Sequence, residues 1–261
     1  MPQFLVGTSG WNYPRWRGNF YPEKLPPRNF LSFYTQSFRS AEVNYSFYQL
    51  PTVATYENWF ATAPDDFIFA LKLSRFITHI KRLRDVKEPW REFLKGARSL
   101  KHKLGPILLQ FPPNFHANDE NRRRVDDFLR YASKDGVRLA MEFRHDSCFD
   151  APMLSVLREH RAVLVIAHSS RFPVPETMAT GDFMYFRFHG PHEWCASSYS
   201  KPELAQWAHS VGSFMERGLD SYAYFNNDAR GDAPPNARLL GELVAKQTTA
   251  KPLVGSHAGA C

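Results

Sequence analysis

Residues 106–110 read PILLQ, a run of apolar residues that ends in a glutamine and is followed by FPP at 111–113. Such a short run, without alternation of polar and apolar residues, indicates a strand buried on both faces. Comparable segments recur on either side of it, and most are also continuous apolar runs. They cover residues 4–9, 40–44, 67–72, 138–143, 162–168, 183–189 and 221–226.

Most intervals between these segments have the spacing of an amphipathic helix. In one interval the apolar residues fall on a single helical face: Trp90, Phe93, Leu94, Ala97 and Leu100. Ser200 and Glu203 form a capping-box pattern for a further helix. Pro202 lies in the first turn of that helix, and Gly218 marks its end.

Two asparagines are candidate caps, and one interval lacks helical character. Asn118, or Asp119 beside it, can cap a helix that carries apolar residues at 125, 128 and 129. Asn236 can cap a last helix over 238–246. Residues 169–181 contain two prolines and little periodicity, so we expect a loop in place of the sixth helix.

Eight strands that alternate with helices predict an α/β fold, a TIM-type (β/α)8 barrel in which one βα unit has a loop for its helix. An open doubly wound sheet is the alternative. We expect one domain over residues 1–247 and a frayed tail over 248–261. No GxGxxG or GxxxxGK[ST] motif follows the first segment, so the sequence does not indicate a dinucleotide or P-loop site.

The composition is that of a globular protein, with 43% hydrophobic and 23% charged residues. The three cysteines, Cys148, Cys195 and Cys261, include no CxxC pair, which disfavours a disulfide framework or a cysteine zinc site. No apolar run approaches the roughly 20 residues that span a bilayer, so we expect a cytoplasmic protein without a membrane partner. The net charge of +7 favours anionic partners, among them nucleic acid.

Polar residues follow the predicted strands where each one ends. In a parallel barrel these ends meet on one face, where loops vary without disturbing the core. Unpaired in a core, each group would cost about 1–3 kcal/mol, so we expect the set to pair internally or to line a wet pocket. The set comprises Ser9, Trp11, Asn12, Tyr13, Glu42, Asn44, Lys72, Gln110, Glu142, Arg144, His145, His168, Arg187, His189, Asn226, Asn227 and Asp228.

The segments that carry these residues resemble the domain of unknown function 72 family, also called YecE-like, over nearly the whole chain. They are GTSGWNYPRWRGNFYP at 7–22, VNYSFYQLP at 43–51, FIFALKLSRFITH at 67–79, LGPILLQFPP at 104–113, MEFRHDS at 141–147, YFRFHG at 185–190 and YFNND at 224–228. The resemblance implies a TIM-type barrel akin to endonuclease IV and the xylose isomerase group, with no assigned reaction. The family usually has an acidic residue near the end of the sixth strand, where this chain has His168.

Glu142 and Glu42 are the best candidates for general acid or base, because a carboxylate in a partly closed pocket can have a raised pKa. The alternative is that arginines or Lys72 neutralise them in a structural network. His145 and His189 are candidates to relay protons or to bind a metal. The chemistry would be acid–base or hydrolytic, as in a hydrolase or an isomerase-like enzyme.

The other strand-end residues are predicted to bind the ligand, an anionic or polyhydroxy small molecule such as a phosphorylated one. Arg144, Arg187 and Lys72 would hold its anionic groups; Lys72 is also a possible Schiff-base nucleophile. Asn226, Asn227 and Asp228 can orient a hydroxylated ligand or act as ordinary turn formers. The remaining predicted ligand-binding residues are Ser9, Trp11, Asn12, Tyr13, Asn44 and Gln110.

A divalent metal is possible but not favoured, and the sequence identifies no cofactor. Its ligands would come from Glu142, His145, His168, His189, His192 and Asp228. Gly190 and Pro191 separate two of these histidines and exclude a regular helical ligand pair. The acidic residues are also too sparse for a cluster of three zinc ions like that of endonuclease IV.

Basic residues crowd the loop after the third strand, where Arg75, Lys81, Arg82 and Arg84 are candidates for binding DNA or RNA. Three arginines at 122–124 follow the fourth strand, and the first loop carries aromatic rings that can stack on bases. A noncatalytic nucleic-acid-binding protein is therefore the alternative function. The same features also fit a solvated helix face and a packed aromatic loop.

Overall fold

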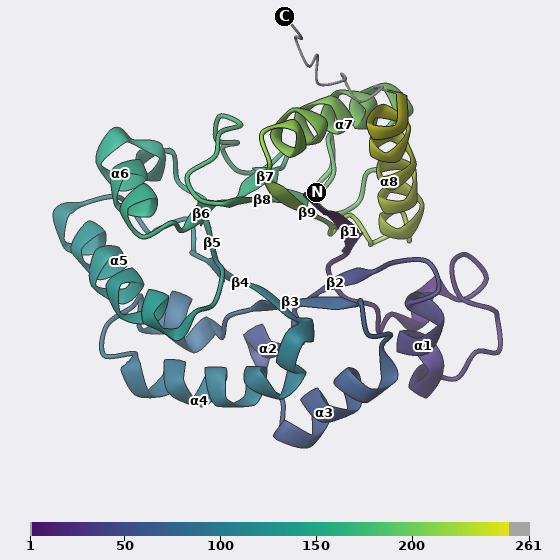
Figure 1. The fold of residues 1–261 in the computed structure, drawn as a ribbon, viewed down its shortest axis with the longest axis horizontal. Coiled ribbons are helices and arrows are strands. Elements are labelled where there is room, and N and C mark those ends of the chain that lie inside the picture. The colour runs from purple at the N-terminus through teal and green to yellow at the C-terminus, as the bar shows by residue number, and fades with distance from the viewer. Residues whose placement is uncertain (1, 251–261) are drawn as a thin grey trace, which may run out of the picture.

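The strands of the computed structural model lie around a common centre, with helices outside them (Figure 1). The structure describes residues 2–250. All the strand pairs are parallel. The strands are β1 (Phe4–Thr8), β2 (Ser40–Val43), β3 (Ile68–Lys72), β4 (Leu104–Gln110), β5 (Leu139–Glu142), β6 (Val163–Leu164), β7 (Ile166–His168), β8 (Phe183–Phe188) and β9 (Asp220–Phe225).

The strands form two sheets, in the orders β1-β9-β8-β7 and β2-β3-β4-β5-β6. The predicted segment 162–168 contains both β6 and β7, separated by Val165. The first of these strands pairs with β5 and the second with β8, so this segment passes from one sheet to the other. Its central residue still donates its N–H to the Met141 carbonyl at 2.9 Å. The α/β fold with parallel strands is thus confirmed.

At the other junction, between β1 and β2, a tyrosine hydroxyl joins the two sheets. The Thr8 N–H donates to the Tyr34 hydroxyl at 2.9 Å, and that hydroxyl donates to the Ser40 carbonyl at 3.1 Å. Gly7 allows this approach, because a Cβ at its position would lie 2.0 Å from the Ser40 carbonyl oxygen. The Tyr34 side chain therefore links β1 to β2, whereas the neighbouring strands within each sheet are joined by backbone hydrogen bonds.

Apolar side chains form one layer inside the strands and another between the strands and the helices. The inner cluster takes residues from both sheets, among them Leu5, Ala70, Leu108, Ala140, Val163, Ala167, Tyr185 and Tyr224. Strands β2 and β9 also meet across the interior, where the Ser40 and Tyr224 hydroxyls are 2.6 Å apart. Side chains on the inner faces of both sheets thus share one interior.

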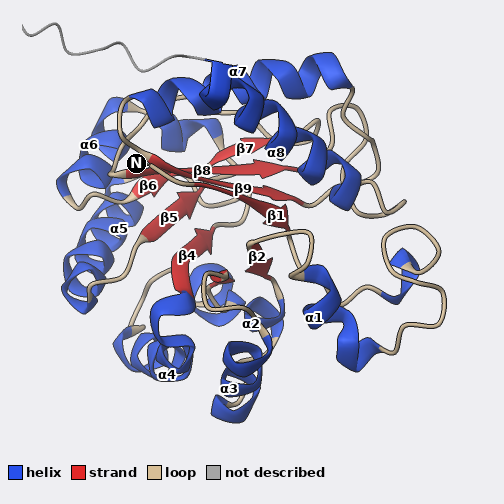
Figure 2. Ribbon diagram, turned by 45° about the vertical axis from the view of Figure 1, so that its right-hand side comes forward, coloured by secondary structure: helices blue, strands red, loops and turns tan. Residues whose placement is uncertain are grey.

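Helices cover the outside of the strands; in Figures 1 and 2, α7 and α8 lie over β8, β9 and β1, with α3 and α4 on the opposite side. Among the described residues, no helix has the length and apolar character needed to cross a membrane. The helices are α1 (Phe30–Tyr34), α2 (Tyr45–Tyr48), α3 (Val53–Thr62), α4 (Lys87–Ala97), α5 (Asp119–Ala132), α6 (Ala151–Glu159), α7 (Lys201–Glu216) and α8 (Ala233–Ala250).

The predicted capping box is present at the start of α7. The Ser200 side chain accepts from the Glu203 N–H, and the Glu203 carboxylate accepts from the Ser200 N–H at 2.8 Å. Asn118 caps α5, accepting from the Asn121 N–H at 2.8 Å. Residues 169–182 connect β7 to β8 without a helix, in agreement with the predicted loop.

The predicted cap at Asn236 is wrong, because α8 begins three residues earlier and contains it. Its side-chain oxygen instead accepts from the Tyr199 N–H at 3.0 Å and from the Asn227 side chain at 2.8 Å. Asn236 therefore joins the loop before α7 and the loop after β9 to α8 by hydrogen bonds. Because α8 extends to Ala250, residues 248–250 of the predicted frayed tail are helical; the rest of that tail lies outside the described residues.

Candidate functional site

Three buried ionic side chains meet inside the strands at their carboxyl ends. Arg187, the fifth residue of β8, donates to both oxygens of Glu42 on β2, through Nε at 2.9 Å and Nη2 at 2.7 Å. Its Nη1 donates to Glu142 on β5 at 2.5 Å. All three are at most 1% exposed. One guanidinium thus forms ion pairs with two carboxylates from the facing sheet, in line with the ion-pairing alternative.

Two hydroxyl groups also donate hydrogen bonds to the Glu42 carboxylate. The Ser9 Oγ donates to Oε1 at 2.7 Å, and the Tyr185 hydroxyl donates to Oε2 at 2.7 Å. Each carboxylate oxygen therefore accepts from one hydroxyl and from Arg187. The hydrogen-bond acceptors of this buried carboxylate are thus satisfied from three residues.

Glu142 is held as a carboxylate, which corrects the raised pKa expected for this residue. Burial acts to raise the pKa of Glu142, but Arg187, Arg144 and other nearby charges outweigh it and leave the pKa well below its ordinary value. Arg144 donates its Nε to Oε1 of this carboxylate at 3.0 Å. Glu142 is therefore an acceptor in the network and not a proton reservoir near neutral pH.

Lys72, at the end of β3, is a buried amine of a different kind. It is 8% exposed, and its Nζ lies 4.1 Å from the centre of the Phe47 ring. Within residues 2–250 its Nζ has no hydrogen-bond acceptor or carboxylate partner. Burial, and after it the charge of Arg187, lowers the pKa of Lys72 to about 7. Both the ammonium and the neutral amine are therefore populated near neutral pH.

His79 and Gln110 border the same space. His79 Nε2 lies 3.4 Å from Gln110 Nε2, and the His79 ring packs edge-on against Phe47. Burial, and then the charges of Lys72 and Arg144, lowers the pKa of His79 to about 4. This histidine is consequently neutral near pH 7, beside two cations.

Arg144 presents the unused end of its guanidinium between two rings. The group lies over Phe172 at 4.6 Å and over Trp194 at 5.2 Å. Its Nε is bound to Glu142, while within the described part of the chain its two Nη atoms have no acceptor. These atoms leave donors for an anion from outside the network.

His189 and Asn226, which directly follow the neighbouring strands β8 and β9, are also brought together. Asn226 Nδ2 lies 3.1 Å from His189 Nδ1, and the histidine ring stacks on Trp194 at 4.6 Å. Burial, and then Arg187, lowers the pKa of His189 well below its ordinary value. The Cys195 sulfur is 4.0 Å from the same Nδ1, but burial raises the pKa of this thiol. A neutral imidazole beside a protonated thiol does not make a thiolate nucleophile.

An aromatic cavity of about 450 Å³ adjoins the polar network, and the predicted first-loop residues line it. Asn44 connects the two, because its Nδ2 donates to the Ser9 carbonyl at 3.3 Å, while no donor among residues 2–250 reaches its buried Oδ1. The Tyr13 hydroxyl donates to the same carbonyl at 2.6 Å. The lining residues include Trp11, Asn12, Tyr13, Asn44, Tyr45, Tyr48 and Trp59.

Three predicted site residues have other partners. His145 stacks on His116 and contacts the Ser147 hydroxyl at 2.9 Å, in the loop after β5. Asn227 is fully buried and donates to the Ser197 carbonyl and to Asn236. Asp228 forms an ion pair with Arg15. These contacts hold loops in place.

The candidate metal ligands do not gather into one site. His168 contacts the Tyr199 hydroxyl at 2.9 Å, and His192 lies 3.8 Å from Glu203. Among the described residues, one group with suitably close ligand atoms lies elsewhere, on α5 and at the end of α6: Asp126, Glu159 and His160. Arg130 already binds the aspartate of that group at 2.5 Å.

The basic loop after β3 is only partly free of acidic partners. Arg84 pairs with Glu120 at 3.4 Å, and the arginines at 122 and 124 also have acidic partners on or near α5. Lys81 lies 5.8 Å from the ring of Phe76, whose side chain is 41% exposed. Arg75 and Arg82 form no ion pair within residues 2–250.

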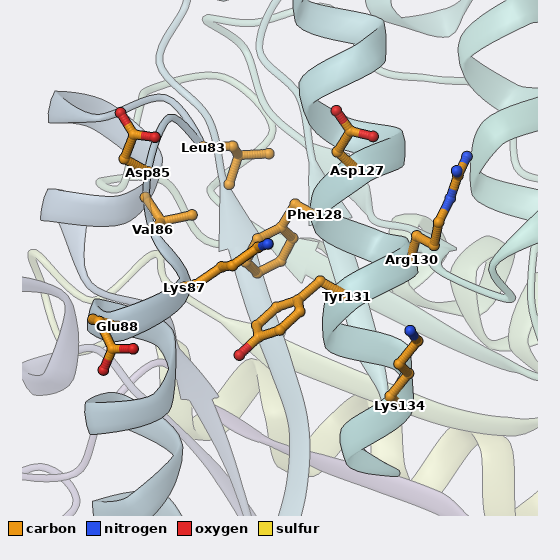
Figure 3. A pocket seen from close by; sticks show the side chains of 10 residues that line it. All are labelled: Leu83, Asp85, Val86, Lys87, Glu88, Asp127, Phe128, Arg130, Tyr131 and Lys134. Carbon is orange, nitrogen blue, oxygen red and sulfur yellow. The ribbon is translucent and has the colours of Figure 1, made fainter.

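A second cavity, of about 690 Å³, lies away from this network, between the start of α4 and the face of α5. Figure 3 shows Lys87 extended toward Tyr131, with Lys134 at one end and Asp85 and Asp127 at the other. The Lys87 Nζ is 5.5 Å from that ring. Since none of its lining residues belongs to the strand-end network, this cavity is separate from the candidate site.

The model of one family, described as "Protein of unknown function DUF72", matches residues 5–257. The chain belongs to this family. One relative of this DUF72 protein is UPF0759 protein YunF of Bacillus subtilis. The two are 25% identical over 92% of this chain and 94% of YunF. UPF0759 protein YecE of Escherichia coli is 29% identical over 42% of this chain and 38% of its own length.

Solved DUF72 structures have the same fold. A DUF72 family protein from Thermotoga maritima has a TM-score of 0.84 and 29% identity, covering 93% of this chain and 99% of its own. A DUF72 family protein from Enterococcus faecalis has a TM-score of 0.77 and 22% identity, covering 94% of this chain and 98% of its own. A xylose isomerase-like TIM barrel/4-hydroxyphenylpyruvate dioxygenase fusion protein has a TM-score of 0.53 and 11% identity, over 98% of this chain and 45% of that one. At these last two identities the likeness concerns the fold alone.

Two residues of the network were not among the predicted site residues. Tyr185 could have been found from alternation, because in a strand it faces the same side as Arg187 and His189. His79 lies in a single helical turn over 76–80 and reaches the site only through the packing of that turn. No spacing in the sequence indicates its proximity to Gln110.

Proposed function

We propose that this protein binds a small anionic molecule, phosphorylated or polyhydroxylated, at the carboxyl ends of its strands and carries out acid–base chemistry on it. One observation carries the proposal: neither the Lys72 ammonium nor the Nη groups of Arg144 have an acceptor among the described residues. Each of these charges lowers the pKa of His79, so they act on one space. An anion there would supply the missing acceptor.

This proposal treats the two sheets as one TIM-type barrel. It is supported by the shared inner cluster and by the Tyr34 hydroxyl, which links β1 to β2. In a barrel the strand ends converge on one pocket. The Arg187 ion network then forms the floor of that pocket, and its walls carry Lys72 from the end of β3 and Arg144 from the loop after β5.

Within this site the neutral amine of Lys72 is the best general base, since its pKa of about 7 matches neutral pH. Glu42 and Glu142 hold Arg187 in place. Asn44 and the aromatic cavity beside it suit the hydroxylated or ring portion of the ligand, because the buried Asn44 Oδ1 can accept from a hydroxyl. The residues that would bind the charged group of the ligand are thus next to those that would bind its hydroxyl groups.

Calorimetric titration with inorganic phosphate, with a hexose phosphate and with the free hexose tests the proposal. Arg144→Met should weaken binding of the phosphates about tenfold or more, because it removes charge-assisted hydrogen bonds. Arg138→Met is the matched control, since Arg138 precedes β5 at its other end and pairs with Asp220 at 2.9 Å. Equal losses in both variants, or no binding of any of these anions, would contradict the proposal.

A second candidate, nucleic-acid binding without catalysis, is favoured by the exposed rings beside the basic loop. Tyr48 is 73% exposed and Phe76 is 41% exposed, and Lys81 lies next to the latter. Fluorescence anisotropy with single-stranded DNA at low salt measures this directly. Lys81→Ala should weaken binding and its salt dependence, whereas Arg144→Met should not.

A further inference from the structure

We infer that Lys72 is a nucleophilic amine that forms an imine with the carbonyl group of an anionic aldehyde or ketone. This inference rests on the proposed anion site and assigns its ligand a carbonyl group. The ammonium of Lys72 lies over the face of the Phe47 ring, and within residues 2–250 no oxygen accepts its protons. A lysine held for structure alone would bind acceptors.

Lys103 provides the comparison within the same molecule. It is 4% exposed, more buried than Lys72, yet its Nζ donates to the Phe60 and Ala63 carbonyls at 2.8 Å each. It lies just before β4, at the opposite end of the strands. One buried lysine is therefore bonded to the backbone, and the other is left without acceptors where the polar network lies.

The surroundings of Lys72 favour the neutral amine that a nucleophile requires. Burial, and after it the charge of Arg187 with a smaller effect of Arg144, lowers its pKa to about 7, outweighing the opposing effects of Glu142 and Glu42. A cation beside a desolvated lysine is one way in which proteins activate such amines. The same Arg144, through its free Nη atoms, can hold the anionic end of a ligand whose carbonyl faces the amine.

The reaction conserves atoms and charge as follows. The Nζ lone pair of the neutral amine attacks the carbonyl carbon, a C–N bond forms and the C=O π bond breaks; Nζ then loses one proton and the oxygen gains one, which gives a neutral carbinolamine. The hydroxyl takes up a second proton and leaves as water while the nitrogen lone pair forms the C=N bond, and the iminium nitrogen releases its remaining proton to give the imine, so the two protons carried off by water equal the two lost from Nζ. No oxidant or reductant is involved. His79 and Gln110 line the space, and His79, neutral at pH 7, can pass the protons.

Borohydride trapping tests the inference on the full-length protein. Glycolaldehyde phosphate, and glycolaldehyde as its uncharged counterpart, are added separately with sodium cyanoborohydride, and the adduct is located by peptide mass spectrometry. We expect the phosphate compound to modify Lys72 at least about tenfold faster than exposed lysines such as Lys95, and to leave Lys103 unmodified. Lys72→Met should abolish the preferential adduct, and excess inorganic phosphate should suppress it.

Three outcomes separate this inference from the proposed function. If phosphate binds at Arg144 but Lys72 is trapped no faster than Lys95, the imine inference fails and the anion site stands. If both aldehydes modify Lys72 equally and phosphate does not compete, the reactive amine stands and the anion site fails. If neither phosphate binding nor selective trapping occurs in a folded protein, both are overturned.

Discussion

Arg187 and Glu42 lie 145 residues apart in sequence and meet through two parallel hydrogen bonds, at 2.9 and 2.7 Å. Both side chains are almost completely buried, at 1% and 0% exposure. A planar guanidinium and a planar carboxylate match in this geometry as a lysine could not. The pair links β8 of one sheet to β2 of the other, so the network that floors the candidate site also joins the two sheets.

Arg187→Met should therefore destabilise the protein strongly. It leaves Glu42 and Glu142 buried without their shared cation, a change that typically costs about 3–5 kcal/mol. Urea unfolding measures the loss. Arg39→Met is the control, because the Arg39–Asp66 pair is more than half exposed on both sides and should contribute less than about 1 kcal/mol. Similar losses in the two variants would refute this role of the network.

The stability of the wild type should depend on pH through Lys72. In the unfolded chain this lysine keeps a proton up to about pH 10.4, whereas in the folded protein it releases it near pH 7. The unfolded state binds more protons between these values, so folding stability rises with pH there, by up to about 1.4 kcal/mol per pH unit. Below about pH 7 the folded protein bears the whole cost of a buried ammonium.

Lys72→Met should remove this slope and be most stabilising, relative to the wild type, at about pH 6. Chemical unfolding of both proteins between about pH 6 and pH 10 provides the comparison. Lys95→Met, on the exposed side of α4, should keep the slope of the wild type. Parallel curves for the wild type and Lys72→Met would show that Lys72 does not release its proton in this range.

Gly7→Ala should disrupt the junction of β1 and β2. The added methyl would lie 2.0 Å from the Ser40 carbonyl and 2.8 Å from the Tyr34 hydroxyl, so a strand has to move. Overpacking of this kind costs about 1–3 kcal/mol, sometimes more. In Gly212→Ala, within α7, the methyl meets only the end of the Gln247 side chain at 3.1 Å, and better helix propensity should make it neutral or stabilising. Equal thermal shifts in the two variants would contradict the close approach.

Asn236→Ala should loosen the loop that precedes α7. It removes the acceptor of the Tyr199 N–H and of the Asn227 side chain, and each unpaired buried donor costs about 1–3 kcal/mol. Hydrogen exchange at Tyr199 should accelerate. The exposed Asn29 serves as control, since its alanine variant should leave this exchange rate unchanged. An unchanged rate of hydrogen exchange at Tyr199 in Asn236→Ala would argue that Asn236 does not hold this loop in place.

Much of the fold could be predicted because the signals for its elements are local. Apolar runs locate the strands, and the side chains of Ser200 and Asn118 bind N–H groups only three residues away. Asn236 shows the limit of this reasoning. Its hydrogen-bond partners, Tyr199 and Asn227, lie in loops and not in the first turn of α8. No local sequence pattern distinguishes an asparagine that caps a helix from one that bonds to distant loops.

The sequence by itself determined that parallel strands alternate with helices and that their ends carry acids, amides and cations, because these properties depend on residue type and near neighbours. Only the tertiary structure decided which charges neutralise one another. It placed Arg187 between Glu42 and Glu142 and gave Lys103 two carbonyls while leaving Lys72 none. Such pairing depends on distances between segments far apart in the chain, and those distances exist only once the strands are assembled.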